Sequence, residues 1–383
     1  MQRSFQLISD PFPTASLTPI RKGTHKSEIL TRSSFSTTIG LPTSSSARGL
    51  LKMTATYAKD QPAGFVNRIE RVAVVGASGQ IGRPITEALL MTGRHTITAL
   101  TRGAINLPAG VNAVPVNYND EATVVSALRG QQVLIISLAA TSPPGTHDLI
   151  VTAALKAGVP LIMPNIWGAD LNNPTRLKEM LIGPSYLARI KKIEELGLKW
   201  TSLCSSFWYE YSLSFSDAYG FDLLGKKATL FDNGGVKINT STWDQCGRAV
   251  AAWLSLKAIP EDENDKSVTV ASWTNKPIYI SSFLVSQRDM LDSIHRVQGT
   301  TDADWEISQE DVKERYQRSL ELVQSGDMVA FRAAMYSRAF FPNGAANYET
   351  SRGLDNDVLG LPKESLDEAT ARAFKMAEAR VRS

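Results

Sequence analysis

The chain has 383 residues, of which 43% are hydrophobic and 21% charged, and its formal net charge is +3. These values are ordinary for a soluble globular protein. No apolar run approaches the roughly 20 residues needed to span a bilayer, two cysteines provide no disulfide framework, and four scattered histidines argue against a metal site.

The basic excess lies at the N-terminal end. Residues 1–70 carry nine Lys or Arg against four Asp or Glu, a net of +5, so the rest of the chain sums to −2. A nearly neutral globular part argues against nucleic-acid binding through a basic surface. Because Cys204 and Cys246 give no disulfide framework and no metal-ligand cluster, we predict that each is a core residue of a protein in a reducing compartment.

Residues 1–69 read as an extension ahead of the folded chain. The first 52 residues are rich in Ser and Thr and poor in acids and aromatics, which is typical of a disordered segment. Two interpretations stay open. The segment resembles an organellar transit peptide, which would place the protein in mitochondria. Alternatively, Met53 is the natural start and the protein is cytoplasmic, an interpretation favoured by the several prolines and the poor amphipathic spacing of the segment.

The most informative segment is residues 72–83, VAVVGASGQIGR, in which four apolar residues lead into three spaced glycines and then a helix. An apolar run of this kind is typical of a strand buried on both faces in a parallel sheet. In a Rossmann-type turn, Gly76 would permit the tight turn, Gly79 the approach of the pyrophosphate, and Gly82 close packing of helix on strand. The helix N-terminus then offers N–H donors to phosphate. The predicted cofactor contacts in this turn are Gly76, Ser78, Gly79, Gln80, Ile81 and Gly82.

The second strand indicates which dinucleotide binds. Residues 95–102, HTITALTR, are largely apolar and end at Arg102, twenty residues beyond Gly82. An NAD-binding domain normally places a carboxylate at this point for the ribose 2′-hydroxyl, whereas an arginine accommodates a 2′-phosphate. No Asp or Glu lies between Glu87 and Asp120. We therefore predict NADPH, rather than NADH, as the cofactor.

From residue 69 onward, strand and helix patterns alternate, which is typical of an α/β protein with a parallel sheet. After the first two strands, we expect strands at 110–117, 133–140, 159–164 and 198–205, and helices at 121–129, 146–157 and 186–196. The predicted fold is a Rossmann-type parallel sheet with helices on both faces. We assign residues 70–205 to this NADP-binding domain.

The last third of the chain is less regular. An NGG sequence at residues 233–235 indicates a hairpin, a helix is expected from Trp243, and several more helices after residue 281. We expect residues 206–383 to form a smaller C-terminal substrate lobe. Within it, residues of about 243–275 are expected to pack back onto the Rossmann domain.

Ligand sites in such sheets gather at the carboxyl ends of the strands. This rule places residues 137–141, 164–170 and 205–211 around one crevice. The predicted contacts there are Ser137, Pro164 and Asn165 with the cofactor, and Trp167, Phe207, Trp208 and Tyr209 with a planar or apolar substrate.

Several of these residues have an ordinary structural explanation as well. Trp167 is nearly as well explained as a core residue, and the aromatic cluster at 207–211 as a hydrophobic contact between lobes. Glu210 is interpreted as a solvated loop residue rather than a buried acid with a role. Asp244 and Arg248 are four residues apart on one helix, so an intrahelical ion pair is expected.

These motifs together resemble the NmrA-like and isoflavone-reductase-like group of atypical short-chain dehydrogenases. GASGQIG is similar to the glycine motif of that group, the TR that ends the second strand to its NADP-selecting arginine, and PNIWGAD at 164–170 to its PSEFG-type segment at the nicotinamide end. Residues 193–203 and 241–254 resemble two later blocks. The resemblance covers residues 70 to about 280, is strongest to fungal members tied to secondary metabolism, and implies an NADPH-dependent reductase.

One position departs from the pattern of the group. Its reductases keep a catalytic lysine eleven residues before the glycine that ends a helix, and counting back from Gly197 gives Tyr186. Lys191 and Lys192 lie five and six residues later and do not substitute for the missing amine. Tyr186 is the candidate catalytic residue, because a phenol of lowered pKa is a competent general acid. The alternative is that Tyr186 only packs against the crevice wall.

Two functions of different classes remain. The first is an NADPH-dependent reductase of a small aromatic or carbonyl-bearing metabolite. The second is a regulatory protein of the NmrA kind that senses the dinucleotide without catalysis, an alternative that the missing lysine strengthens. In either case the expected partner is a small molecule, with no nucleic acid, membrane or metal, and the protein is expected to be a monomer or homodimer.

Overall fold

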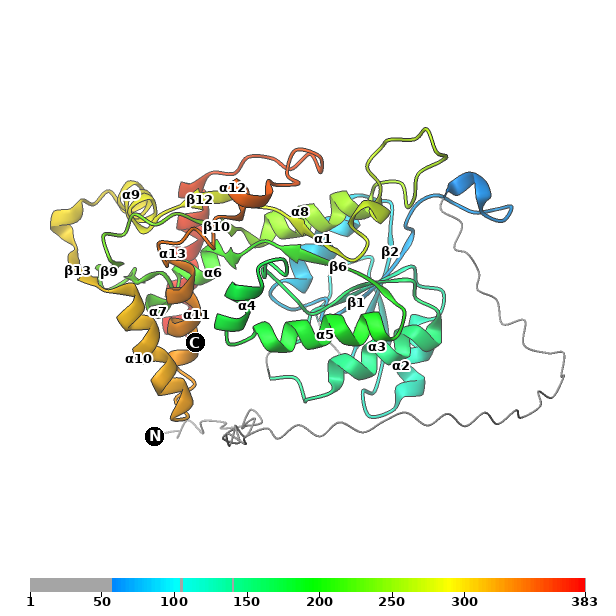
Figure 1. Ribbon diagram of the computed structural model, residues 1–383, viewed down its shortest axis with the longest axis horizontal. Coiled ribbons are helices and arrows are strands. Elements are labelled where there is room, and N and C mark those ends of the chain that lie inside the picture. Colours follow the sequence, from blue (N-terminus) through cyan, green and yellow to red (C-terminus); the bar gives the residue numbers. More distant parts are fainter. Residues whose placement is uncertain (1–56, 104–105, 140, 383) are drawn as a thin grey trace, which may run out of the picture. The chain divides into compact units, whose positions relative to one another are not determined.

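The computed structural model describes residues 57–103, 106–139 and 141–382. No helix within this described part is both long and apolar enough to cross a membrane. A seven-stranded parallel sheet dominates the first part of the chain (Figure 1). In order across the sheet, its strands are β11 (Lys276–Tyr279), β6 (Lys199–Cys204), β5 (Leu161–Met163), β4 (Val133–Ile136), β1 (Arg71–Val75), β2 (Thr96–Thr101) and β3 (Asn112–Pro115).

This strand order creates a topological switch point. The chain runs from β1 outward through β2 and β3, and then returns to the other side of β1 with β4. Crossovers on the two sides therefore diverge above the carboxyl ends of β1 and β4, which is where open α/β sheets bind ligands. The predicted Rossmann-type fold is confirmed.

Helices cover both faces of the sheet, because successive residues of each buried strand point to opposite sides. Val72 and Val74 of β1 pack in a core cluster beneath α1 (Gly82–Met91) and α8 (Trp243–Leu254). Ala73 and Val75 pack in a separate cluster on the opposite face. The helices of that second face are α2 (Glu121–Leu128), α3 (Thr146–Ala157) and α5 (Gly183–Glu195), and α4 (Pro174–Glu179) precedes α5.

Two later elements of the chain, α8 and β11, return to the Rossmann sheet. Helix α8 packs along α1, and Gly247 allows the close approach, since a Cβ there would lie 2.5 Å from the Pro84 carbonyl oxygen. Strand β11 then pairs in parallel with β6 and extends the sheet. The Rossmann core thus draws on residues as late as Tyr279. Both cysteines are buried, as predicted.

The rest of the C-terminal part builds an aromatic core around two small three-stranded sheets. One sheet has the order β12 (Phe283–Val285), β10 (Ile238–Ser241) and β7 (Phe207–Trp208), and the other β13 (Glu306–Glu310), β9 (Lys227–Phe231) and β8 (Phe221–Asp222). The helices around them are α6 (Tyr209–Leu213), α7 (Ser216–Tyr219), α9 (Gln287–Gln298), α10 (Val312–Gln324), α11 (Ala330–Ala339), α12 (Tyr348–Arg352) and α13 (Leu366–Arg382). Short 3-10 turns lie at Ala58–Asp60, Val270–Trp273 and Asp302–Asp304.

The hairpin predicted at residues 233–235 is wrong. The turn chemistry is present, since Gly234 has a φ of 71°. However, β9 before the turn pairs with β8 and β13, whereas β10 after it pairs with β7 and β12. Both strands thus find their partners elsewhere in the chain, and the turn joins two different sheets.

Candidate active site

The glycine turn after β1 is built by contacts that only glycine permits. Gly76 has a φ of 78°, and a Cβ on it would lie 1.9 Å from the carbonyl oxygen of Ser137. A Cβ on Gly82 would lie 2.0 Å from the carbonyl oxygen of Gly76. Gly79 is different, because it is exposed and its nearest neighbour, the Gly76 carbonyl oxygen, lies 3.1 Å from the ideal Cβ position. Two glycines therefore shape the turn, and the third keeps its outer surface open.

The turn presents backbone donors at the N-terminus of α1. Ser78, Gly79 and Gln80 are exposed, whereas Ile81 is buried in the core beneath them. Gly79 N–H donates to the Gly76 carbonyl, and among the described residues the N–H groups of Ser78, Gln80 and Ile81 have no acceptor. Free N–H groups at a helix N-terminus attract an anion such as a diphosphate. The turn has the donors that a dinucleotide needs.

Arg102 stands at the end of β2, the strand next to this turn, and its side chain is exposed. Its charge acts on Tyr118: burial raises the pKa of that phenol, and the nearby guanidinium opposes the rise. The position is compatible with the predicted 2′-phosphate contact, which stays a prediction.

Beyond the carboxyl ends of the strands, Asn165 joins the loops that follow β4 and β5. Its Oδ1 accepts a hydrogen bond from Leu138 N–H, and its Nδ2 donates to the Leu138 carbonyl, both at 3.2 Å. The indole N–H of Trp167 donates to the same Oδ1 at 3.2 Å. Two further predicted cofactor contacts lie at the same junction, because Ser137 directly precedes Leu138 in the chain and Pro164 directly precedes Asn165. The amide therefore fixes the two loops against each other.

The loop after β6 joins the same group. Gly168 N–H donates to the Leu203 carbonyl at 3.0 Å, and Ser206 N–H donates to the Gly168 carbonyl at 3.1 Å. Gly168 has a φ of 85°, and a Cβ there would lie 2.3 Å from the Ser206 carbonyl oxygen. The three segments that the sequence placed around one crevice are in contact at the carboxyl edge of the sheet.

Tyr186, on α5, lies against this junction. Burial raises the pKa of its phenol, while the charge of Arg189 and a hydrogen bond from the Trp167 backbone oppose the rise. The Arg189 guanidinium lies 5.6 Å from the centre of the Tyr186 ring, and its Nη1 donates to the Asn165 carbonyl at 2.5 Å. Arg189 was not predicted from the sequence, because the spacing of the lysine in similar reductases points to position 186. The sequence did contain a signal for this pair, because an arginine three residues after a tyrosine lies beside it on the surface of a helix.

A buried histidine faces the same arginine. His147 is 6% exposed, in the first turn of α3. Burial and the nearby Arg189 charge lower its pKa to about 4, so the ring is neutral at neutral pH. Its Nε2 is buried and has no hydrogen-bond partner among the described residues. The junction at Asn165 thus brings together a phenol, a guanidinium and a neutral imidazole.

The predicted substrate residues occupy different environments. Phe207 is half-buried and stacks on Tyr336, with ring centres 3.9 Å apart. Trp167 and Trp208 are half-buried and pack against the cluster that contains Ile81. Tyr209 has no exposed surface, and its hydroxyl is hydrogen-bonded to Thr370 at 2.8 Å. For Tyr209, this environment favours the packing role over a substrate contact.

Two expectations from the sequence are wrong. Glu210 is not solvated but 3% exposed, and burial raises its pKa to about 7. It is buried because α6 begins immediately after β7 and turns this side chain toward the start of α8, where Glu210 Oε1 accepts from Trp243 N–H. Arg248 pairs not with Asp244 but with Glu364, at 2.6 Å, because the segment before α13 crosses α8 at this point.

The chain is similar to one protein-family model and to a fungal oxidoreductase. Residues 76–210 match the NAD(P)H-binding family model. Oxidoreductase aprR of Aspergillus flavus is 28% identical over 317 residues, which are 80% of this chain and 99% of the relative.

Two solved structures show the same fold. The quinone oxidoreductase QOR2 of Escherichia coli, solved with NADPH, has a TM-score of 0.56 and 19% identity over 79% of this chain and 99% of its own. An isoflavone reductase has a TM-score of 0.57 and 18% identity over 79% of this chain and 98% of its own. The predicted resemblance to isoflavone reductase is confirmed for the fold, and residues 76–210 match the NAD(P)H-binding family model.

Proposed function

We propose that this chain is an NADPH-dependent oxidoreductase that reduces a small aromatic or carbonyl-bearing metabolite. Its residues 76–210 match the NAD(P)H-binding family model, and its fold is that of an isoflavone reductase. A fungal relative named as an oxidoreductase, matched over nearly its full length, supports the reaction class. By the resemblance, we expect a role in secondary metabolism.

The residues present fit NADPH. The open N–H groups of Ser78, Gln80 and Ile81 would hold the diphosphate, and Arg102 the 2′-phosphate. Asn165 would lie at the nicotinamide end, because it joins the loops after β4 and β5. When bound there, the cofactor supplies a hydride from C4 of its nicotinamide.

The observation that carries the proposal is the convergence of Tyr186, Arg189 and Asn165 at that end of the crevice. Reduction of a carbonyl leaves an alkoxide that needs a proton. The Tyr186 phenol would donate it. Its pKa is raised by burial and not lowered as expected from the sequence, so the phenol stays protonated, and the positive charge of Arg189 offsets part of the cost of the phenolate that remains. Arg189 is a positioning residue in this scheme, because its hydrogen bond to the Asn165 carbonyl ties α5 to the loop after β5.

The test is a Tyr186→Phe variant, assayed for NADPH consumption with a panel of aldehydes, ketones and enones. Loss of a general acid lowers kcat by about 10² to 10⁴-fold. NADPH affinity, measured by calorimetry, should stay within about twofold, because the substitution removes only the phenol oxygen. Lys191→Met is the matched control, since Lys191 is exposed on the same helix and pairs only with Glu195 in the described chain.

Two results would contradict the proposal. Unchanged turnover in Tyr186→Phe removes Tyr186 as the proton donor and leaves it a packing role. Tight NADPH binding by the unmodified chain, without turnover of any compound on the panel, favours the regulatory, non-catalytic alternative over an enzyme.

A further inference from the structure

Arg83 puts a positive charge in the first turn of α1, directly after the last glycine of the cofactor turn. A cation is unfavourable at this position, because the N-terminus of a helix is the positive end of its dipole. The first turn of α1 has no acidic residue to offset the charge. The stability of α1 alone therefore does not explain Arg83, and the charge favours an anion beside the turn.

The Arg83 side chain reaches from α1 to the loop that follows β2. Its Nη2 donates to the Asn106 carbonyl oxygen at 2.7 Å, and its Nη1 donates to Glu87 Oε1 at 3.0 Å. Asn106 comes four residues after Arg102 in the chain. Arg83 thus connects the cofactor turn with the loop in which the sequence places the 2′-phosphate contact.

The corner between the turn and this loop is open to solvent. Arg102 and Gly103 are exposed, and a Cβ on Gly103 would have no described atom within 4 Å. Gly79 of the turn is exposed as well, and the side chain of Arg83 is 37% exposed. Solvent therefore reaches both guanidinium groups, and a phosphate bound by them needs no enclosed cavity.

Arg83 can hold a phosphate and a carboxylate at the same time. A guanidinium has five N–H donors, and two of those of Arg83 are used by Asn106 and Glu87. Its remaining donors have no acceptor in the part of the chain that the structure describes. The side chain of Glu87 is 46% exposed. Without Arg83, Glu87 would therefore leave an unpaired negative charge on α1 beside this loop.

We propose that Arg83 is a second residue that selects NADPH, in addition to Arg102. Its remaining N–H groups donate to the 2′-phosphate, and its ion pair with Glu87 keeps that carboxylate from repelling the phosphate. The inference rests on the proposed function, because the anion is taken to belong to the cofactor. The diphosphate is the other anion of the same molecule. The contact with the loop after β2, where the ribose of a dinucleotide is ordinarily held, favours the 2′-phosphate.

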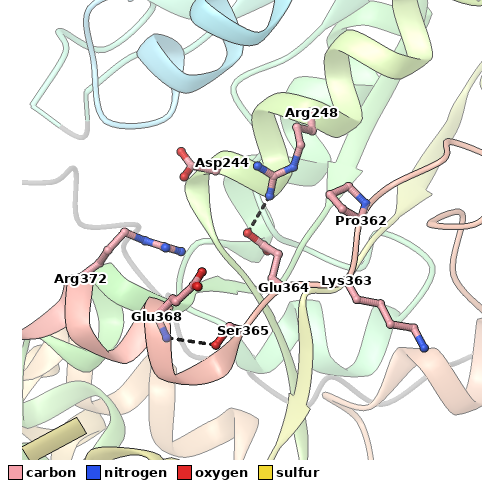
Figure 2. A pocket seen from close by; sticks show the side chains of 8 residues that line it. All are labelled: Asp244, Arg248, Pro362, Lys363, Glu364, Ser365, Glu368 and Arg372. Carbon is pink, nitrogen blue, oxygen red and sulfur yellow. Dashed lines mark hydrogen bonds and ion pairs between the residues drawn. The ribbon is translucent and has the colours of Figure 1, made fainter.

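Arg248, on the neighbouring helix α8, is a matched control. Its side chain is 35% exposed, close to the value for Arg83, and its Nη2 donates to Glu364 at 2.6 Å. Figure 2 shows this pair in the wall of a pocket of about 410 Å³. Arg248→Met removes an arginine and an ion pair from the same two packed helices, but not from the glycine turn. It should lower the melting temperature and leave the ratio of NADPH to NADH affinity unchanged.

The test is a calorimetric titration of the full chain with NADPH and with NADH, repeated for Arg83→Met, Arg83→Lys and the double variant Arg83→Met, Glu87→Gln. The melting temperature of each variant shows whether it folds. We expect Arg83→Met to weaken NADPH about 10- to 100-fold, and NADH less than about threefold. Arg83→Lys keeps the charge but not the planar fork, so it should weaken NADPH about three- to tenfold. This variant decides the question if Arg83→Met does not fold.

The double variant should regain part of the lost NADPH affinity, because an amide at position 87 does not repel a phosphate. A merely structural role of Arg83 predicts no recovery, since Glu87→Gln cannot restore the bond to Asn106. Equal losses of NADPH and NADH would place Arg83 at the diphosphate, and unchanged NADPH affinity in the folded Arg83 variants would remove its role. Either result overturns the inference while NADPH binding by the parent chain stands. A parent chain that binds neither nucleotide would overturn both this inference and the proposed function.

Discussion

Arg102 is the residue on which the choice of dinucleotide depends. A charge-assisted hydrogen bond to a phosphate contributes about 1.5–3 kcal/mol, which corresponds to about 10 to 100-fold in affinity. Arg102→Ala should therefore weaken NADPH by that factor and NADH by less than about threefold, measured by calorimetric titration. Arg129→Ala, a change at another exposed arginine, is the control. Equal losses for the two dinucleotides would refute the assignment.

Glu210 makes stability depend on pH. Its pKa in the folded chain is about 7, against 4.5 for the ordinary carboxyl, with burial as the main cause, opposed by Arg372 on α13 and reinforced by Asp244 on α8. Between pH 4.5 and about pH 7, Glu210 is ionised in the unfolded chain but still protonated in the folded chain. Stability is therefore highest below about pH 4.5 with respect to this group, and is lost as the pH rises to about 7.

Glu210→Gln removes this titration. Relative to the variant, the parent chain should lose on the order of 1–3 kcal/mol of unfolding free energy between pH 5 and pH 8, since each unit of pKa shift corresponds to about 1.4 kcal/mol. Urea unfolding at a series of pH values measures the difference. Parallel profiles for the two proteins would show that Glu210 is ionised in the folded chain across this pH range and would contradict the raised pKa.

At the scale of elements, the contact between α1 and α8 supports the cofactor turn, because α1 begins in that turn. Gly247→Ala places a Cβ 2.5 Å from the Pro84 carbonyl oxygen and forces the helices apart. We expect a loss of about 1–3 kcal/mol in unfolding free energy and weaker NADPH binding. Gly103→Ala, whose new Cβ would have no described atom within 4 Å, is the control for stability. An unchanged melting temperature for Gly247→Ala would contradict this packing.

The Rossmann elements could be predicted because their patterns are local. The apolar run before Gly76 and the helical spacing of 146–157 depend only on neighbouring residues, and α3 has the predicted bounds. The hairpin at 233–235 failed because strand pairing is not local: β9 takes β13 from 75 or more residues later in the chain as a partner. Turn residues specify where a chain bends, not which strands it joins.

At the scale of the whole folded chain, the segment between α12 and α13 connects the two parts of the described structure. Asp355 Oδ2 accepts from Tyr279 N–H of β11 at 2.8 Å, and Glu364 accepts from Thr242 and Arg248 at the start of α8. The sequence offered no signal for these contacts, since the partners are more than 70 residues apart. Arg372 and Glu210 are also far apart in the chain, so their approach to each other could not be predicted from the sequence either. By contrast, the crevice segments were predictable, because strand ends gather by a topological rule.

The proposed function depends on NADPH binding at the N-terminal turn of α1. A calorimetric titration of the full chain with NADPH and with NADH tests this binding. We predict one NADPH bound per chain and an NADH affinity at least about tenfold weaker, the effect of the missing 2′-phosphate on Arg102. A chain that releases no heat with either nucleotide, and whose melting temperature neither nucleotide raises, would contradict the account.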